Sequence, residues 1–256
     1  DLQDTFSKGI ERRHERSFGP MRFVFKMEFN RLVKYERHVI DSFDHCTIIS
    51  EQDRQDLPVS DKSKVTIVRN GVDMAYFAPQ ESVKNTDVLF AGNMGYPPNV
   101  MAGEFLARDV LPILQKSNPQ IKITLAGATP APAIKSLASD KIEVTGWVND
   151  MRDCYARAHV FVAPMMIGTG LQNKLLEAMS MGIPCITSAL ANNALGATPN
   201  QHLIIAKSPL EFAEAINNLL DNSNQAREIG EAGRNFIQEN YSWEGQTEPL
   251  LTLLSR

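Results

Sequence analysis

Short apolar runs alternate with helix-length segments along most of this chain, and this alternation constrains the fold more than any other feature. Six runs have the length of strands: Val88–Ala91, Ile121–Ala126, Ile142–Val144, Val160–Ala163, Pro184–Thr187 and Leu203–Ile205. Helices fit the segments 99–116, 130–138, 149–157, 171–181, 191–196, 209–221 and 224–239. Such an alternation is typical of a parallel sheet covered on both faces. We therefore predict an α/β domain with a doubly wound parallel sheet.

The first 74 residues do not repeat this pattern. Apolar residues recur every three or four positions in 21–43, which predicts one long amphipathic helix. A strand at 46–50, a helix ending near Leu57 and a strand at 65–68 follow. The turn at Asn70-Gly71 then separates this part from the alternating region. These few elements predict an incomplete amino-terminal α/β portion.

Composition excludes several classes of protein. The 43% hydrophobic content is ordinary for a globular chain, and no apolar run reaches the roughly eighteen residues of a membrane span. No signal-peptide pattern opens the sequence, so a cytoplasmic location is the expectation. The formal net charge of −4 argues against nucleic acid as a main partner.

Charge is nevertheless uneven, because residues 1–40 hold nine Lys or Arg against six acidic residues. One interpretation is a peripheral contact with anionic lipid or with an anionic acceptor. A solvated amphipathic helix explains the same residues equally well. The sequence leaves both interpretations open.

The three cysteines, Cys46, Cys154 and Cys185, are widely spaced among apolar residues. An odd number with such spacing predicts buried thiols and neither a disulfide framework nor a zinc site. No metal site is predicted elsewhere in the chain.

Residues 168–177 read Gly-Thr-Gly-Leu-Gln-Asn-Lys-Leu-Leu-Glu and join a predicted strand to a helix. A helix start presents unpaired N–H groups, and Gly168 and Gly170 would let a phosphate approach the backbone. Lys174 and Glu177 are three residues apart and share a helix face, which suits a phosphate and a ribose hydroxyl respectively. The alternative is a simple turn followed by a solvated ion pair.

The loops after the first four predicted strands would meet at one edge of the sheet, because ligands of open α/β sheets lie beyond the carboxyl ends of the strands. These loops are 92–99, 127–132, 146–150 and 165–171. Neither the dinucleotide fingerprint nor the Walker pattern is present in them. We therefore predict an anion site at this edge that uses neither of these two motifs.

Several segments together resemble a known family, the GT-B glycosyltransferases of group 1 (family 4-like), a branch that includes bacterial sugar transferases of polysaccharide biosynthesis. The resemblance covers the chain from about residue 65 to its end and rests on Ile67–Asp73, Phe77–Pro79, Val88–Asn99, Ile123–Gly127, Gly146–Val148, Asn173–Met179 and Gly182–Pro184. It implies two Rossmann-like domains, of which the carboxyl-terminal one holds a nucleotide-sugar donor.

The resemblance also implies roles for individual residues. Lys174 would contact the diphosphate and Glu177 the ribose, and these two are the candidate catalytic residues. Gly92 and Asn93 would border the diphosphate. The remaining donor-binding candidates are the base-pocket residues Gly146, Trp147 and Val148, together with Gly168, Thr169, Gly170, Leu171 and Asn173.

This chain departs from the family pattern in two respects. Many relatives carry a glutamate eight residues before the position of Glu177, where this chain has Thr169. A basic residue common in the first glycine loop or before the second is also missing, and Met94 and Met166 lie nearby instead. The implied domains are a remnant of the acceptor-side domain at 1–74, the donor domain at 75–240 and a crossover helix at 241–256, so we expect a fragment.

The function implied is transfer of a sugar from a nucleoside diphosphate sugar to a hydroxyl of a glycan or lipid-linked acceptor. Retention at the anomeric carbon is expected, with no metal and no cofactor other than the donor substrate itself. Two alternatives remain: a donor-binding module without activity of its own, and a nucleotide-sugar epimerase of the same fold.

Overall fold

The computed structural model describes residues 1–2, 4–167 and 170–255, and the chain divides into two compact units. The first unit comprises Asp1–Gly71, Gly168–Leu171 and Trp243–Arg256. The second comprises Val72–Ile167 and Gln172–Ser242. The domain boundaries expected at residues 74 and 240 stay predictions.

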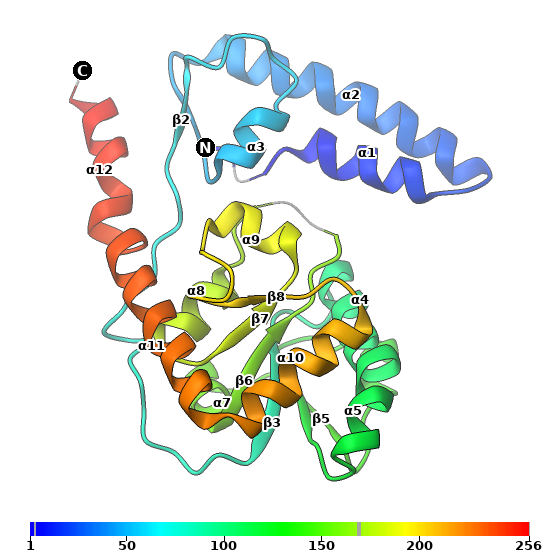
Figure 1. Ribbon diagram of the computed structural model, residues 1–256. Helices are drawn as coiled ribbons and strands as arrows, with labels where there is room; N and C mark the ends of the chain where they lie inside the picture. Colours follow the sequence, from blue (N-terminus) through cyan, green and yellow to red (C-terminus); the bar gives the residue numbers. More distant parts are fainter. Residues whose placement is uncertain (3, 168–169, 256) are drawn as a thin grey trace. The chain divides into compact units, whose positions relative to one another are not determined.

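A six-stranded parallel sheet forms the centre of the second unit (Figure 1). Its strands are β3 (Thr86–Ala91), β4 (Ile123–Ala126), β5 (Ile142–Gly146), β6 (Ala158–Ala163), β7 (Cys185–Thr187) and β8 (Ile204–Ile205). All six predicted strands are confirmed. The order is β5-β4-β3-β6-β7-β8, and every pair is parallel. Along the chain, β4 and β5 are added on one side of β3, and β6, β7 and β8 are then added on its other side. The pair β3–β6 is therefore the topological switch point.

Helices connect these strands, and the prediction of a doubly wound α/β fold is confirmed. They are α4 (Pro97–Phe105), the π-helical segment η1 (Leu106–Val110), α5 (Leu111–Ser117), α6 (Pro132–Lys135), α7 (Met151–Arg157), α8 (Asn173–Ser180), α9 (Ala189–Leu195), α10 (Pro209–Asp221) and α11 (Ser223–Asn240). Right-handed crossovers on the two sides of the switch point send helices to opposite faces of the sheet. In agreement, α10 packs on α5, while α11 packs on α8.

The central strands of this sheet are buried on both faces. Val88, Leu89 and Phe90 of β3 are fully buried, and so are Val160 and Phe161 of β6. Near-continuous apolar strands of this kind are what a parallel sheet covered by helices requires. The rigid core therefore ends directly beneath the loops that follow β3 and β6.

The first predicted helix of this unit, at 99–116, differs in detail from the structure. It begins two residues earlier, at Pro97, and is interrupted by η1. Pro97 and Pro98 fit the first helical turn because that turn needs no N–H donor from them. Apolar periodicity does not reveal a single widened turn, so η1 could not be expected from the sequence.

The first unit contains two antiparallel helices, α1 (Phe6–Arg16) and α2 (Pro20–Ser42), which pack side by side (Figure 1). They are followed by β1 (Cys46–Ile48), α3 (Glu51–Asp56) and β2 (Val65–Ile67), and α12 (Trp243–Leu254) also belongs to this unit. β1 and β2 pair in parallel. A small core joins the elements through Ile40, Cys46, Ile48, Leu57 and Val65.

Helix α1 was not predicted. Its sequence, FSKGIERRHER, is mostly charged and carries few apolar residues, so its apolar face is too sparse to form a pattern. The backbone N–H of Ser7 donates to Oε1 of Glu36 on α2 at 3.0 Å, and both residues are buried. Packing against α2 therefore supplies the stability that the sequence of α1 does not show by itself.

Three further expectations concern chemistry that the fold could carry. Cys46, Cys154 and Cys185 are buried and free, as predicted. In residues 1–2, 4–167 and 170–255, no cluster of three His, Cys, Asp or Glu could hold a metal ion. Within the same residues, no helix is long and apolar enough to cross a membrane.

Candidate functional site

The ammonium group of Lys174 lies over the carboxyl end of β3. Lys174 is the second residue of α8, and its Nζ donates a hydrogen bond to Oδ1 of Asn99 on α4 at 2.5 Å. Nζ also lies 4.8 Å from the ring centroid of Phe90 and 3.9 Å from Sδ of Met165. The lysine from the loop-helix segment after β6 thus reaches the loop after β3, across the switch point of the sheet.

Gly92 makes this approach possible. A Cβ atom at position 92 would lie 3.1 Å from Nζ of Lys174 and 2.7 Å from Nδ2 of Asn99. Contacts of that length force a neighbour to move, so any larger residue would displace the amide that holds the ammonium. The first glycine of the predicted site therefore has a specific task, which is to leave room for Lys174 and Asn99.

Hydrogen bonds fasten the loop after β3 to the loop after β4. The N–H groups of Gly92 and Met94 donate to the carbonyls of Ala126 and Ala128, at 3.0 and 2.9 Å. Thr129 also donates through Oγ1 to Oδ1 of Asn93 at 2.7 Å. The predicted meeting of these loops at one edge of the sheet is present in the structure, and it fixes the floor beside Lys174.

Lys174 has neutral partners in this position. Within the described residues, no carboxylate forms an ion pair with it. Its hydrogen-bond acceptor is the neutral amide of Asn99. Burial lowers the pKa of Lys174 from its ordinary value of 10.5 to about 8, and the negative charge of Glu177 opposes that effect. The site therefore holds a cation whose charge is poorly compensated, and such a cation attracts an anion.

Glu177 lies one turn further along α8 and has a different partner. The hydroxyl of Tyr155, a fully buried residue of α7, donates to Oε2 of Glu177 at 2.7 Å. Burial raises the pKa of the Glu177 carboxyl, whereas the Tyr155 hydrogen bond and the charge of Lys174 lower it. The Tyr155 hydroxyl thus orients the Glu177 carboxylate, which acts on Lys174 through its charge and not through a hydrogen bond.

Among the other candidates, the structure brings Gly92, Asn93 and Lys174 together. Gly146 ends β5, two strands away from β3, and next to it the Trp147 side chain is 71% exposed while Val148 is partly buried. Their role in a base pocket stays a prediction.

The remaining candidates follow β6. Asn173 is the first residue of α8, whereas Gly170 and Leu171 group with the first unit. Gly168 and Thr169 lie outside the described residues. The donor-binding roles of these five residues stay predictions.

Two residues at the site received no role from sequence reasoning. Asn99 lay inside the motif that carried the family resemblance, and Tyr155 lay in a predicted helix. The sequence signal that could have pointed to Asn99 is its place. It follows Pro97 and Pro98 in the first turn of a helix, and this helix begins just after the carboxyl end of a strand. For Tyr155 no local signal exists, because its contact spans 22 positions in the chain.

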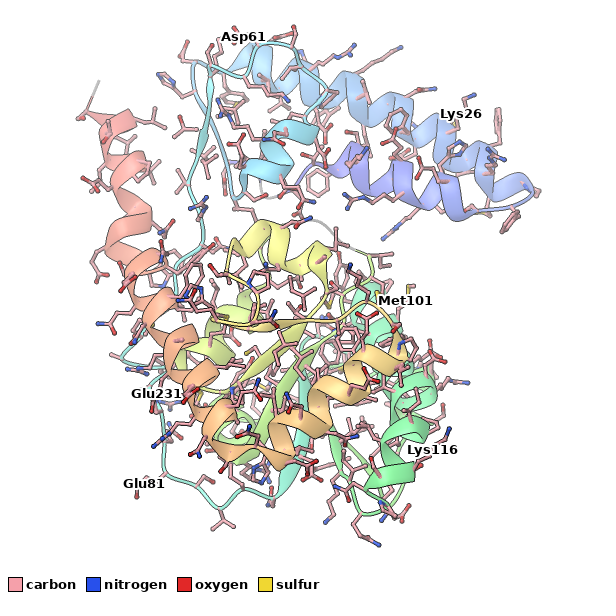
Figure 2. The ribbon with its side chains drawn as sticks, viewed as in Figure 1. Lys26, Asp61, Glu81, Met101, Lys116 and Glu231 are labelled. Atoms are coloured by element: carbon pink, nitrogen blue, oxygen red, sulfur yellow. The ribbon has the colours of Figure 1, made fainter. Side chains whose placement is uncertain are left out.

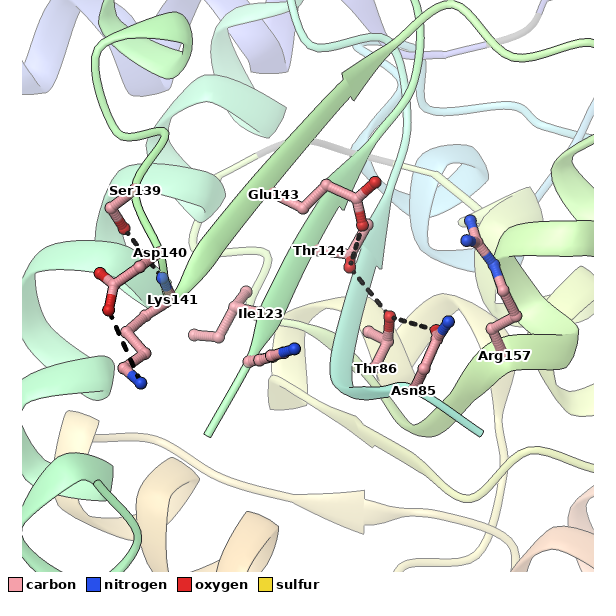
Figure 3. Close-up of a pocket in the computed structure, with 10 residues that line it drawn as sticks. Asn85, Thr86, Ile123, Thr124, Ser139, Asp140, Lys141, Glu143 and Arg157 are labelled. Carbon is pink, nitrogen blue, oxygen red and sulfur yellow. Dashed lines mark hydrogen bonds and ion pairs between the residues drawn. The ribbon is translucent and has the colours of Figure 1, made fainter. Parts of the chain in front are cut away.

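A cavity of about 340 Å³ lies at the opposite edge of the sheet, where β3, β4 and β5 begin (Figure 3). Its floor is a chain of hydrogen bonds in which Thr124 donates to Glu143 and shares a bond with Thr86. Ligands of doubly wound sheets bind at the carboxyl edge, where Lys174 lies. We therefore assign the candidate site to Lys174 and not to this cavity.

Comparison with known proteins agrees with the geometry. The family model described as glycosyl transferases group 1 matches residues 85–222, more than half of the chain. An uncharacterised 44.6 kDa protein from the cps region of Klebsiella pneumoniae is 30% identical over 61% of this chain and 43% of its own length. The alpha-maltose-1-phosphate synthase of Mycolicibacterium smegmatis is 27% identical over 85% of this chain and 64% of its own length.

Among solved structures, HepE of Anabaena in complex with UDP and glucose superposes with a TM-score of 0.75 at 12% identity, covering 88% of this chain and 67% of that one. This likeness shows that the fold is of the GT-B type. The chain spans only 43% and 64% of the two curated relatives described above.

Proposed function

This chain belongs to the glycosyl transferases group 1 family, and on that premise we propose that its second unit binds a nucleoside diphosphate sugar, the donor of a sugar-transfer reaction. One observation carries the proposal: the ammonium of Lys174 lies at the Gly92 loop, on the switch point of a doubly wound sheet, with no carboxylate partner among the described residues. A diphosphate is the anion that such a position suits.

Lys174 would act mainly on the leaving group. When the bond between sugar and diphosphate breaks, negative charge grows on the phosphate oxygens. A cation already held in a partly desolvated position stabilises that charge more in the transition state than in the ground state. Because the site around Lys174 is fixed by Asn99 and Gly92, little reorganisation would be needed during the reaction.

Glu177 would hold the ribose. Tyr155 occupies Oε2, so a ribose hydroxyl would donate to Oε1. This role requires an ionised carboxylate. Burial raises the pKa of Glu177 above its ordinary value, and the hydrogen bond from Tyr155 together with the charge of Lys174 limits that rise. For the whole protein we propose transfer to a hydroxyl of a glycan or lipid-linked acceptor, with retention and without a metal ion.

Calorimetric titration with UDP, ADP, GDP and their sugar conjugates tests donor binding. Lys174→Ala should weaken binding by about 1–3 kcal/mol, because a charge-assisted contact is lost. Lys122→Ala, an exposed lysine at the opposite edge of the sheet, is the matched control and should leave binding unchanged. Failure of every sugar nucleotide to bind the unmodified chain would refute the proposal.

A second candidate function is donor binding without transfer of the sugar. Gly92, Asn99 and Lys174 all belong to the second unit, so this unit holds these proposed donor contacts by itself. Donor hydrolysis and transfer, followed by product analysis after donor binding has been established, separate the two. Binding without turnover supports the donor-binding module, and turnover supports the transferase.

We also propose that the tip of the α1–α2 hairpin contacts the inner face of a membrane. Phe18 is 88% exposed and Phe23 is 72% exposed, and Met27 on the same side of α2 is exposed as well. Arg22 and Lys26 flank them, and Figure 2 shows Lys26 among the side chains that project from α2. Aromatic residues beside cations are typical of a helix that lies in the interface of an anionic bilayer.

Cosedimentation with phosphatidylglycerol vesicles tests this contact, with phosphatidylcholine vesicles for comparison. The pair Phe18→Ser and Phe23→Ser should lower partitioning more than tenfold, since burying one such side chain contributes about 1.5–3 kcal/mol. Phe43→Ser, at the far end of α2, should have little effect. An equal loss in the Phe43 variant would argue against a contact at the tip.

A further inference from the structure

Asn99 is the hydrogen-bond partner of Lys174, the cation of the proposed diphosphate site. The loop 92–99, which follows β3 and opens α4, contains no Lys or Arg. The positive charge at this loop comes instead from Lys174 on α8, a residue 75 positions away in the chain. The Lys174 side chain has many other rotamers available, so a group in the loop must hold its ammonium in place.

The Asn99 side chain does this through both ends of its amide. Oδ1 accepts from Nζ of Lys174 at 2.5 Å, and Nδ2 donates to the carbonyl of Asn93 at 2.9 Å. The residue is only 5% exposed. Because an ammonium can only donate and a carbonyl can only accept, the two partners permit one orientation of the amide. Asn99 thus links the ammonium rigidly to the backbone of the Gly92 loop.

The neutrality of Asn99 matters as much as its position. A carboxylate of the same shape would form an ion pair with Lys174 and neutralise the charge that a ligand needs. A side chain without an acceptor would release the ammonium toward Met165 and Phe90, neither of which can replace the hydrogen bond. An amide is the group that holds a cation in place and leaves its charge available.

We infer that Asn99 is a positioning residue, which aims the Lys174 ammonium at the diphosphate of the donor without neutralising it. The inference rests on the proposed function, because it assigns the diphosphate to Lys174. It adds a residue whose effect reaches the ligand only through another side chain.

The first experiment needs no ligand and tests the link between the two residues. Protein labelled with ¹³C at the lysine ε carbon is titrated by NMR, and the Lys174 signal is assigned from its loss in Lys174→Gln. In Asn99→Asp the Lys174 pKa should rise by about 1–3 units, since a carboxylate replaces an amide. In Asn99→Ala it should fall below that of the unmodified chain.

Charged groups that act on Lys174 in this titration are few. Among the described residues Glu177 is the charged group that raises its pKa, and Glu177 is itself bonded to Tyr155. Asn217→Asp is the matched control, because it adds the same charge on α10, where Asn217 bonds Ser117 at the end of α5. An Asn99→Asp titration equal to that of the control would overturn the inference.

The second experiment measures binding of UDP and of uridine, which lacks the phosphates. Asn99→Asp should weaken UDP binding about tenfold at pH 7.5, equivalent to ~1.4 kcal/mol, and should leave uridine binding unchanged. Equal losses for both ligands would mean that Asn99 only supports the loop, and the inference would be wrong. If UDP, ADP and GDP all fail to bind the unmodified chain, the proposed function fails, and the ligand-free titration still decides the link to Lys174.

Discussion

The two edges of the six-stranded sheet both carry positive charge, yet they use it differently. At the amino edge, Lys141 donates to Oε1 of Gln120, Arg157 donates to the carbonyl of Asp153, and Lys84 donates to the carbonyl of Ala158. At the carboxyl edge, Lys174 has an amide, a thioether and an aromatic ring around it. The amino edge also places a carboxylate beside a cation, since Nζ of Lys141 lies 3.7 Å from Asp140, whereas no carboxylate forms an ion pair with Lys174 among the described residues.

The difference follows from the direction of the helices. Helices α5, α6 and α7 end at the amino edge, where their last carbonyls attract cations. Helices α4 and α8 begin at the carboxyl edge, where the helix ends favour anions and oppose a cation. A lysine at that edge is therefore unfavourable for folding and useful for binding. The comparison teaches that the partners and the desolvation of a charged group, and not its charge alone, distinguish a binding site from a structural contact.

The largest expected effect concerns the glycine that lets the loops of the carboxyl edge meet. Gly127 has φ of +138°, and a Cβ there would overlap the carbonyl oxygen of Gly92. Gly127→Ala should lower the free energy of unfolding by about 3–5 kcal/mol, from backbone strain plus overpacking. Urea denaturation followed by circular dichroism measures the change.

Gly146→Ala is the matched control for that substitution. Gly146 also has a left-handed φ, of +68°, but a Cβ there would meet no atom within 4 Å. Its loss should be limited to the backbone term, about 1–2 kcal/mol. Similar losses in the two variants would show that the contact between the loops of Gly92 and Gly127 is looser than the structure indicates.

Two hydroxyl–carboxylate hydrogen bonds, one behind the proposed site and one in the amino-edge cavity, sharpen the comparison next. Tyr155 donates to Glu177 from a fully buried position, and Thr124 donates to the exposed Glu143. Tyr155→Phe should cost about 1.5–3 kcal/mol, because the acceptor is a partly buried carboxylate. Thr124→Val should cost about 1 kcal/mol, since water can replace the bond to Glu143 and the Thr86 hydroxyl, which loses Thr124, still donates to Asn85. Thermal or urea unfolding of both variants would decide, and a reversed order would break the comparison.

How much of this could be predicted from the sequence depends on whether the signal is local. The six strands of the doubly wound sheet followed from short apolar runs, because buried parallel strands have a characteristic apolar composition. Lys174 was identified from a glycine turn at a helix start, whereas Gly92 was identified from the family resemblance. Their meeting through Asn99 depends on the strand order β4-β3-β6, which no local pattern contains. Helix α1 was missed for the same reason, because it is stabilised by α2 and not by its own periodicity.

A smaller effect concerns the pH dependence of stability. Burial lowers the pKa of Lys174 to about 8 in the folded chain, while in the unfolded chain it keeps the ordinary value of 10.5. The unfolded state therefore binds more protons between pH 8 and 10.5, and the contribution of Lys174 to stability rises across that range. Because the side chain is partly exposed, we expect a rise of about 1–2 kcal/mol.

Lys174→Met isolates that contribution, because it keeps the length of the side chain and removes the titrating group. Other groups titrate equally in both proteins and cancel in the difference. Urea denaturation at pH 7 and pH 10 should show the unmodified chain gaining on the variant as the pH rises. A stability difference that does not change with pH would mean that Lys174 is well solvated, and the claim that burial lowers its pKa would be wrong.

The smallest expected effect comes from the amino edge itself. Lys122 is exposed there and lines the cavity, with no hydrogen bond from its ammonium in the described part of the chain. If desolvation distinguishes the two edges, a cation that water surrounds should not bind an anion tightly, even when the cation has no partner in the protein. Lys122→Ala should therefore change the free energy of unfolding by less than about 0.5 kcal/mol. Phosphate and UDP should bind it as they bind the unmodified chain, which calorimetry at low salt can check. Weaker phosphate binding would instead place an anion site at the amino edge, and then desolvation of the cation could not be what separates the two edges.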